Sequence, residues 1–227
     1  MSKFESLNNP VWNALNTVHK PLALTYGLAA RYPHVVSPLA GLQESTAAAF
    51  ADLTQLVSWG ESIALFTTTP PEVPSDWTVQ RSRWIDQMVC EQPPAAEQYD
   101  LLELRKEDVP EMLALSAATE PGPFSEGTIR MGRYRGIRSQ AGALLAMAGE
   151  RLRLKGFTEV SAVCTTPEAR GQGYGRVLVS AVASLVYADE MTPFLHVKTE
   201  NGAKQLYEKL GFRVRCPIRL TVLTRTP

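Results

Sequence analysis

The chain has 227 residues, of which 44% are hydrophobic and 20% charged, and its 23 basic side chains balance its 23 acidic ones. These values are ordinary for a soluble globular protein of one large or two small domains. The balanced charge gives no field that would favour nucleic acid or a membrane surface as partner.

The cysteine count and the hydropathy indicate the cellular compartment in which the protein is expected. The three cysteines are odd in number and lack CxxC spacing, which argues against a disulfide framework or a zinc site and favours a reducing cytoplasm. No apolar run approaches the roughly 18 residues that span a bilayer. The segment after Met1 lacks the apolar region of a secretory signal, so we expect a cytoplasmic protein.

The first part of the chain mixes short helices and strands. Asn9-Pro10 resembles an N-cap followed by proline at the first helical position, and a second helix is expected to open at Ser45 and close at Gly60. Short apolar strands are expected at 22–26, 62–66 and 84–90. The polar, proline-containing segment 91–97 is the best domain boundary, so we expect domains over 1–95 and 96–227.

The second part alternates strands and helices. Strands are expected at 101–104, 132–137, 143–154, 158–165, 193–197, 211–215 and 218–224, and helices are expected to begin at Asp108, Arg176 and Asn201. This order predicts an α/β (α+β) fold with a mixed, mostly antiparallel sheet flanked by helices. Antiparallel hairpins come first and one βαβ crossover follows, beside a smaller N-terminal α/β domain.

The most informative stretch is RGQGYG, from Arg170 to Gly175, between the β-branched run 158–165 and the amphipathic run 176–188. The first turn of a helix has backbone N–H groups without partners, and the helix dipole adds partial positive charge there. Glycines let a ligand approach such a backbone closely, which is typical of a phosphate site. A tight turn between a strand and a helix, without a ligand, is the alternative reading.

Two common nucleotide motifs do not fit this stretch. The glycines follow G-x-G-x-G rather than G-x-G-x-x-G, and the six residues 165–170 separate them from the strand. No strand ends at Asp189, where a ribose-binding acid would be expected. A Walker A loop is excluded because no Gly-Lys-Ser/Thr follows.

Two motifs carry a family resemblance. Arg170-x-x-Gly173-x-Gly175, after a strand ending in VCTTP, resembles the (Q/R)-x-x-G-x-(G/A) signature of the GNAT superfamily of acyl-CoA-dependent N-acyltransferases. The segment AKQLYEKLGF, from Ala203 to Phe212, is similar to the final helix and turn of that superfamily. Residues 145–167 are most similar to the branch related to glycine N-acyltransferases. The resemblance covers about 100–227 and implies a GNAT-type sheet, acetyl-CoA or another acyl-CoA as co-substrate, and no metal.

The resemblance also implies cofactor contacts. The backbone of Gly171, Gln172, Gly173, Tyr174 and Gly175 would hold the pyrophosphate, with charge from Arg170 and Arg176. The backbone of Val163, Cys164 and Thr165 would pair with the pantetheine arm as an added strand. An asparagine that commonly precedes the family's tyrosine by seven residues is Glu200 here, so Asn201, one residue later, is the candidate for this cofactor contact. Thr166 stands where close relatives tend to have histidine.

The resemblance assigns the acid and base roles as well. Tyr207 would protonate the departing thiolate, and Glu159 would take the proton of the amine. Plain core packing is the alternative for Tyr207, and a solvent-facing strand position is the alternative for Glu159. Glu150 and His196 are weaker candidates for the base. A covalent acyl-enzyme on Cys164 is disfavoured, because no histidine is placed in sequence to activate it.

Two segments have no defined chemistry. The stiff loop 119–124 is either a wall of the acceptor site or a rigid connector. Residues 1–95 carry no chemical motif, and in two-part relatives such a segment resembles a degenerate, partial copy of the same fold.

The sequence therefore predicts an N-acetyltransferase that moves an acyl group to a primary amine of a small molecule or amino acid, by direct attack in a ternary complex. The alternative is a non-catalytic module that binds acyl-CoA or a partner. We expect no nucleic acid or membrane partner, and the oligomeric state, a homodimer included, is open.

Overall fold

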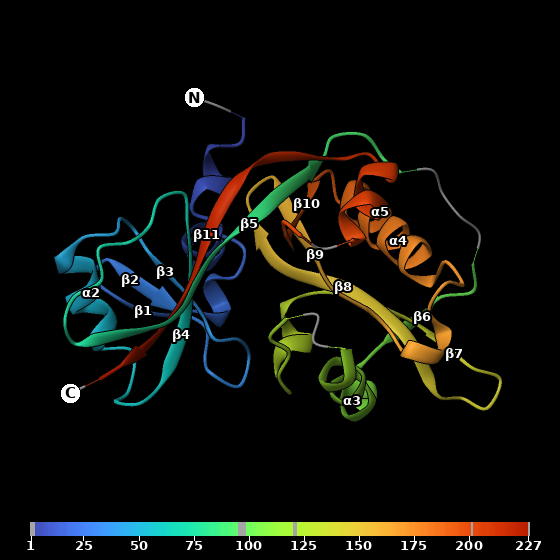
Figure 1. The fold of residues 1–227 in the computed structure, drawn as a ribbon, viewed down its shortest axis with the longest axis horizontal. Helices are drawn as coiled ribbons and strands as arrows, with labels where there is room; N and C mark the ends of the chain where they lie inside the picture. Colours follow the sequence, from blue (N-terminus) through green and yellow to red (C-terminus); the bar gives the residue numbers. More distant parts are fainter. Residues whose placement is uncertain (1–2, 95–98, 120–121, 201, 227) are drawn as a thin grey trace.

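The computed structural model describes residues 3–94, 99–119, 122–200 and 202–226. Within these ranges eleven strands form one sheet, in the order β1-β2-β3-β4-β11-β5-β10-β9-β8-β7-β6. Figure 1 shows the N-terminal part (blue to cyan) at one end of the molecule, with β5 and β11 running from it to the other end. Parallel and antiparallel pairs both occur, with antiparallel pairs in the majority. The predicted mixed α/β class is therefore confirmed.

The N-terminal part is built from short elements. They are η1 (Glu5–Asn8), α1 (Pro10–Asn16), η2 (Lys20–Leu22), β1 (Leu24–Tyr26), β2 (Ala29–Arg31), β3 (Leu39–Leu42), α2 (Ala47–Thr54), β4 (Ser62–Thr67) and β5 (Trp77–Cys90). Pro10 opens α1 as predicted. The limits predicted for the second helix are wrong: Thr46 caps α2 by accepting a hydrogen bond from the Ala49 N–H, and the helix ends at Thr54, before Gly60.

The strands β5 and β11 (Phe212–Arg225) are 14 residues long each and pair along their length. Two separate strands, 211–215 and 218–224, were predicted where β11 runs. Pro217, between them, lacks the N–H that a central strand uses. The structure corrects this to one strand with a bulge between Val214 and Cys216, beside the proline. A bulge absorbs such an interruption without ending the strand.

The predicted domain boundary at 95/96 lies outside the described residues. Strand β5 precedes it in sequence, yet β5 pairs with β10 from the second part of the chain as well as with β11. Both parts of the chain therefore contribute to one continuous sheet. The division into domains 1–95 and 96–227 stays a prediction.

The second part follows the predicted order closely. Its elements are β6 (Leu102–Leu104), η3 (Lys106–Asp108), α3 (Val109–Thr119), η4 (Thr128–Met131), β7 (Tyr134–Arg138), β8 (Leu144–Leu154), β9 (Phe157–Thr165), η5 (Pro167–Ala169), α4 (Tyr174–Ala188), β10 (Thr192–Lys198), α5 (Ala203–Lys209) and β11. Strands β6 to β9 form antiparallel neighbours. The unit β9-α4-β10 is the parallel crossover that the sequence predicts.

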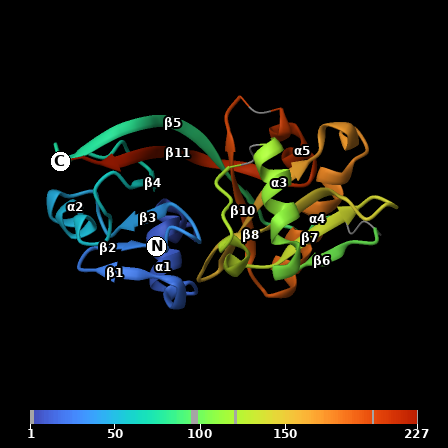
Figure 2. The same cartoon turned by 90° about the horizontal axis from the view of Figure 1, so that it is seen from below.

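Helices cover both faces of this half of the sheet. Figures 1 and 2 show α4 and α5 together on one face and α3 on the other. Leu178, Val179 and Val182 of α4 are fully buried in a cluster with Val160 of β9 and Leu195 of β10. Because this face of α4 is buried against β9 and β10, the N-terminus of α4 is held near the C-terminal end of β9. Among the described helices, none is long and apolar enough to cross a membrane.

Candidate functional site

The glycine-rich loop before α4 presents bare backbone. Gly171 and Gly173 have φ angles of 80° and 81°, in the left-handed region that glycine adopts without strain. A Cβ added to either glycine would meet no protein atom within 4 Å. The mouth of the loop is therefore open, and protein side chains do not fill it.

The backbone N–H groups at this mouth have no acceptor among the residues that the structure describes. Helix α4 has 15 residues, its N-cap is Gly173, and no side chain caps it. For residues 171–175, no N–H group donates to any acceptor in the described parts of the chain. Arg170 and Arg176 are exposed on either side. Unpaired N–H groups, the helix dipole and two cations make this loop suited to an anion.

Strands β9 and β10 diverge next to the loop. They pair only through Phe157–Thr192, Thr158–Pro193 and Glu159–Phe194. Beyond that point β10 continues its pairing with β5, and β9 continues its pairing with β8. The facing edges of 160–165 and 195–198 thus have no strand partner on this side, and an extended ligand with amide groups can pair with them.

A bulge bends β9 within this free edge. Three residue steps from Ser161 to Cys164 lie opposite two steps on β8, from Gly149 to Met147. Ala162 takes up the extra residue with φ 52°, an uncommon conformation for a residue with a side chain. The bulge adjoins Val163, Cys164 and Thr165, whose backbone was predicted to pair with the pantetheine arm.

Tyr207 lies on α5 beside the diverging strands. Its side chain belongs to the same cluster as Val160 of β9 and Val197 of β10. Burial raises the pKa of its phenol to about 12, so the phenol stays protonated at neutral pH. Within the described ranges its hydroxyl has no hydrogen-bond partner. A buried proton donor without a partner, next to a free strand edge, can protonate a leaving group there.

Glu159 lies on the opposite face of β9 and is completely buried. Its carboxylate oxygens accept hydrogen bonds from Arg151 at 2.6 and 2.8 Å and from Nδ1 of His196 at 2.7 Å. Burial alone would raise its pKa, but the Arg151 and His196 contacts outweigh it and hold the pKa at about 2. The alternative of a solvent-facing strand position is wrong. A carboxylate in this setting is a weak proton acceptor, so the predicted base role gains no support here.

Of the other candidates for base or nucleophile, Glu150 is already paired with an arginine and Cys164 is unreactive. Glu150 is fully buried and binds Arg133 at 2.5 Å. Burial raises the pKa of the Cys164 thiol to about 11, which disfavours the thiolate that a covalent route needs. Asn201 lies outside the described residues. Glu200 and Gln172 are exposed.

Sequence reasoning missed Arg151 and Gln87. Gln87 lies on β5, 109 residues before His196, and its Nε2 atom is 3.1 Å from that ring. No local pattern links these two positions. Arg151 could have been found, because the predicted turn at 155–156 brings it nearly opposite Glu159 across a hairpin.

The predicted acceptor loop 119–124 is described only in part. Residues 120–121 lie outside the described ranges, and Thr119 ends α3. The Phe124 ring contacts that of Tyr134, with ring centres 5.7 Å apart. The Tyr134 hydroxyl is buried on the same side of the sheet as α3, and it has no hydrogen-bond partner among the described residues.

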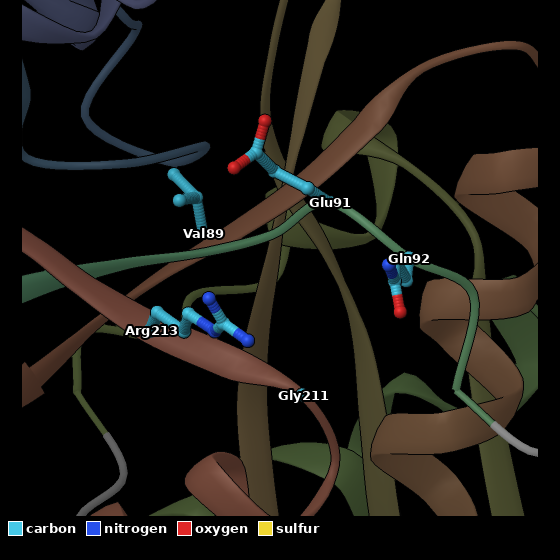
Figure 3. Close-up of a pocket in the computed structure, with 5 residues that line it drawn as sticks. All are labelled: Val89, Glu91, Gln92, Gly211 and Arg213. Atoms are coloured by element: carbon cyan, nitrogen blue, oxygen red, sulfur yellow. The ribbon is translucent and has the colours of Figure 1, made fainter.

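A small surface hollow of about 160 Å³ lies elsewhere, where β5 ends and β11 begins. Figure 3 shows Arg213 and Gln92 on its sides, with Glu91 turned away from them. The Tyr187 hydroxyl, near the C-terminal end of α4, donates to the carbonyl of the adjacent Cys90 at 2.5 Å. The hollow is therefore at the far end of α4 from the glycine loop.

Two parallel strands diverge here, and they lead to the glycine-rich start of a helix that no side chain caps. This arrangement is typical of a binding site for an extended anionic ligand. Residues 134–220 match the FR47-like protein family. The whole structure is similar to a GNAT-family protein from Novosphingobium aromaticivorans DSM 12444 that is designated an acetyltransferase. The two are 36% identical, with a TM-score of 0.91 over 98% of this chain and 100% of the other. The chain therefore belongs to the GNAT family.

More distant structures share the fold. One is a GCN5-related N-acetyltransferase from Kribbella flavida, at 14% identity and a TM-score of 0.65 over 96% of each chain. Another is a GCN5-related N-acetyltransferase-like protein from Streptococcus suis, at 12% identity and a TM-score of 0.60 over 93% of this chain and 91% of the other. Among curated proteins no sequence matches. The branch related to glycine N-acyltransferases stays a prediction.

Proposed function

We propose that the protein transfers an acyl group, most simply acetyl, from acyl-CoA to a primary amine of a small molecule or amino acid. The observation that carries this proposal is the row of unpaired N–H groups at 171–175, open to solvent beside a free strand edge. The pyrophosphate of the coenzyme fits the loop, and its amide-bearing pantetheine arm fits the edge.

The transfer is a direct attack in a ternary complex. The lone pair of the neutral amine forms the C–N bond, the C–S bond breaks, and the departing thiolate takes its proton from Tyr207. A backbone N–H near Val163 or Cys164 polarises the thioester carbonyl. The amine gives up one proton, which passes through water to the tyrosinate and restores the acid, so that protons balance. Glu159 was predicted to accept this proton, and its burial and its ion pair disfavour that role.

A pair of glycine variants tests the coenzyme site. Gly173→Ala and Gly156→Ala each place a side chain at a φ near 80° with open space around it, so their backbone strain is matched at about 1 kcal/mol. Gly156 lies in the β8–β9 turn, at the opposite end of β9 from the loop. We expect Gly173→Ala to weaken CoA binding at least tenfold in calorimetry and Gly156→Ala to leave it unchanged. Equal binding by both variants would contradict the site.

Turnover separates an enzyme from its rival, a non-catalytic module that binds acyl-CoA. Release of free thiol from acetyl-CoA would be measured against a panel of amines and amino acids. We expect release with at least one acceptor, dependent on acceptor concentration. Tight CoA binding without release for any acceptor would favour the binding module.

A further inference from the structure

A row of side-chain hydrogen bonds crosses five neighbouring strands. It runs from Arg151 on β8 to Glu159 on β9 and His196 on β10, and then to Gln87 on β5 and Arg215 on β11. Nη2 of Arg151 is 2.6 Å from Glu159, and Nδ1 of His196 is 2.7 Å from Glu159. Nε2 of Gln87 is 3.1 Å from Nε2 of His196, and Nη1 of Arg215 is 2.6 Å from Oε1 of Gln87. We call these five residues the transverse row.

The partners fix the direction of each bond. The oxygen of Gln87 accepts from Arg215, and its nitrogen also donates to the Leu7 carbonyl at 3.0 Å, so the amide cannot be turned round. Gln87 therefore donates to Nε2 of His196. The ring carries its hydrogen on Nδ1 and donates it to ionised Glu159. A neutral histidine with both ring nitrogens bonded is held in one tautomer and one orientation.

The row passes over the point where the cleft opens. Backbone pairing of β9 with β10 ends at Glu159 and Phe194, and His196 lies two residues beyond that end. The Glu159–His196 bond is thus a side-chain link between the two strands just where their backbone link stops. Val160, Leu195 and Val197 face Tyr207 on the other side of the sheet. The transverse row therefore lies behind the closed end of the cleft, on the face of the sheet opposite to Tyr207.

We propose that Glu159, His196 and Gln87 are positioning residues, which hold β9 and β10 at a fixed separation where the thioester binds. Through Gln87 on β5, the N-terminal part of the chain also helps to hold these two strands in place. The proposal rests on the proposed function, and in it His196 and Glu159 do not accept the proton of the amine.

Two substitutions of His196 distinguish positioning from proton transfer. Asparagine can place an N–H group near the position of Nδ1 and does not titrate, whereas alanine offers no donor. If the row positions the strands, H196N keeps kcat within about threefold of wild type and H196A loses about tenfold to a hundredfold. Coenzyme affinity falls by less than kcat in both, because the glycine loop that holds the pyrophosphate is intact. If His196 is a base, both variants lose activity alike and an acidic limb of the wild-type pH profile of kcat disappears.

Hydrogen exchange gives a readout that does not depend on turnover. The backbone amides of 160–165 and 195–198 should exchange faster in H196A than in wild type, and at the wild-type rate in H196N. Thr158→Val is the matched control. Thr158 neighbours Glu159 and is fully buried, its hydroxyl has no hydrogen-bond partner in the described parts of the chain, and valine has a similar shape. Wild-type exchange in H196A would overturn the proposal.

The two proposals can fail separately. If wild type binds no acyl-CoA, the proposed function fails, while the exchange comparison still tests the transverse row. If H196A does not fold, Gln87→Leu replaces it, since this change removes the bond to Nε2 and leaves the Glu159–His196 bond in place. Faster exchange at 195–198 is then expected, and an unchanged rate would overturn the role of Gln87.

Discussion

At the scale of single residues, Tyr207 has the clearest chemical role in the proposal. Its phenol is buried, protonated at neutral pH and free of protein partners within the described ranges, so its proton is available to a ligand. The ring also packs against Phe212, with ring centres 6.1 Å apart, and Tyr207→Phe preserves this contact. Effects of that substitution on the fold should therefore be small.

We expect Tyr207→Phe to lower kcat by about 10² to 10⁴, the usual contribution of general acid catalysis, with the Kd for CoA nearly unchanged. Steady-state thiol release and calorimetry would measure the two quantities. Tyr187→Phe is the matched control, since it removes a hydroxyl near the C-terminal end of α4. Normal turnover by Tyr207→Phe would leave the acid role without support and favour plain packing.

The residue level also shows how far sequence reasoning reaches. The position of Glu159 on the motif strand follows from the apolar run around it. Arg151 follows from the predicted hairpin turn, whereas His196 and, behind it, Gln87 come from strands that only the sheet topology brings next to β9. A solvent-facing position was the alternative given for Glu159, and in the structure Glu159 is instead buried beside the oppositely charged Arg151.

At the scale of elements, β9 has an irregularity that its sequence hides. The run TEVSAVCT has good strand propensity throughout. Ala162 nevertheless adopts a positive φ, because the bulge needs one extra residue at that point. The glycine loop, the crossover and the hairpins were predictable from turn residues and periodicity. The bulge and the three- and four-residue strands β2 and β3 were not, since so few residues show no period.

The bulge predicts that a favourable strand residue is unfavourable at this position. Ala162→Val should lower the free energy of unfolding by about 1–2 kcal/mol, because a β-branched side chain is strained at positive φ. Urea denaturation would measure it. Ser161→Val is the control, since its neighbouring position is also half-buried but has no positive φ. If both valine variants are equally stable, the backbone at Ala162 does not carry strain.

At the scale of the whole molecule, hydrogen bonds and buried ion pairs connect the N-terminal part of the sheet with its C-terminal part. The transverse row joins β8 to β11, and a further bond from Arg215 to Asn8 reaches η1. Breaking one partner of a buried ion pair costs more than the pair itself contributes, because the remaining charge stays unpaired. Loss of Glu159 should therefore affect the entire fold, which shares one sheet.

The pH dependence of stability follows from the same carboxylate. The pKa of Glu159 is about 2 in the folded protein and 4.5 as the ordinary value, with Arg151 and His196 holding it down against burial. Above pH 4.5 both the folded and unfolded states are ionised, so its contribution is constant. As the pH falls from about 4.5 to about 2, the unfolded state binds a proton that the folded state does not, and stability is lost.

Integrated over that window, the loss is on the order of 3 kcal/mol. The variant Glu159→Gln lacks the titrating group but keeps all other carboxylates and the buried His19. Its difference from wild type in unfolding free energy should therefore be constant from pH 8 to 5 and shrink below 4.5, as urea denaturation at several pH values would measure. A difference that stays constant down to pH 3 would show that Glu159 has an ordinary pKa and that its ion pair with Arg151 does not form in solution.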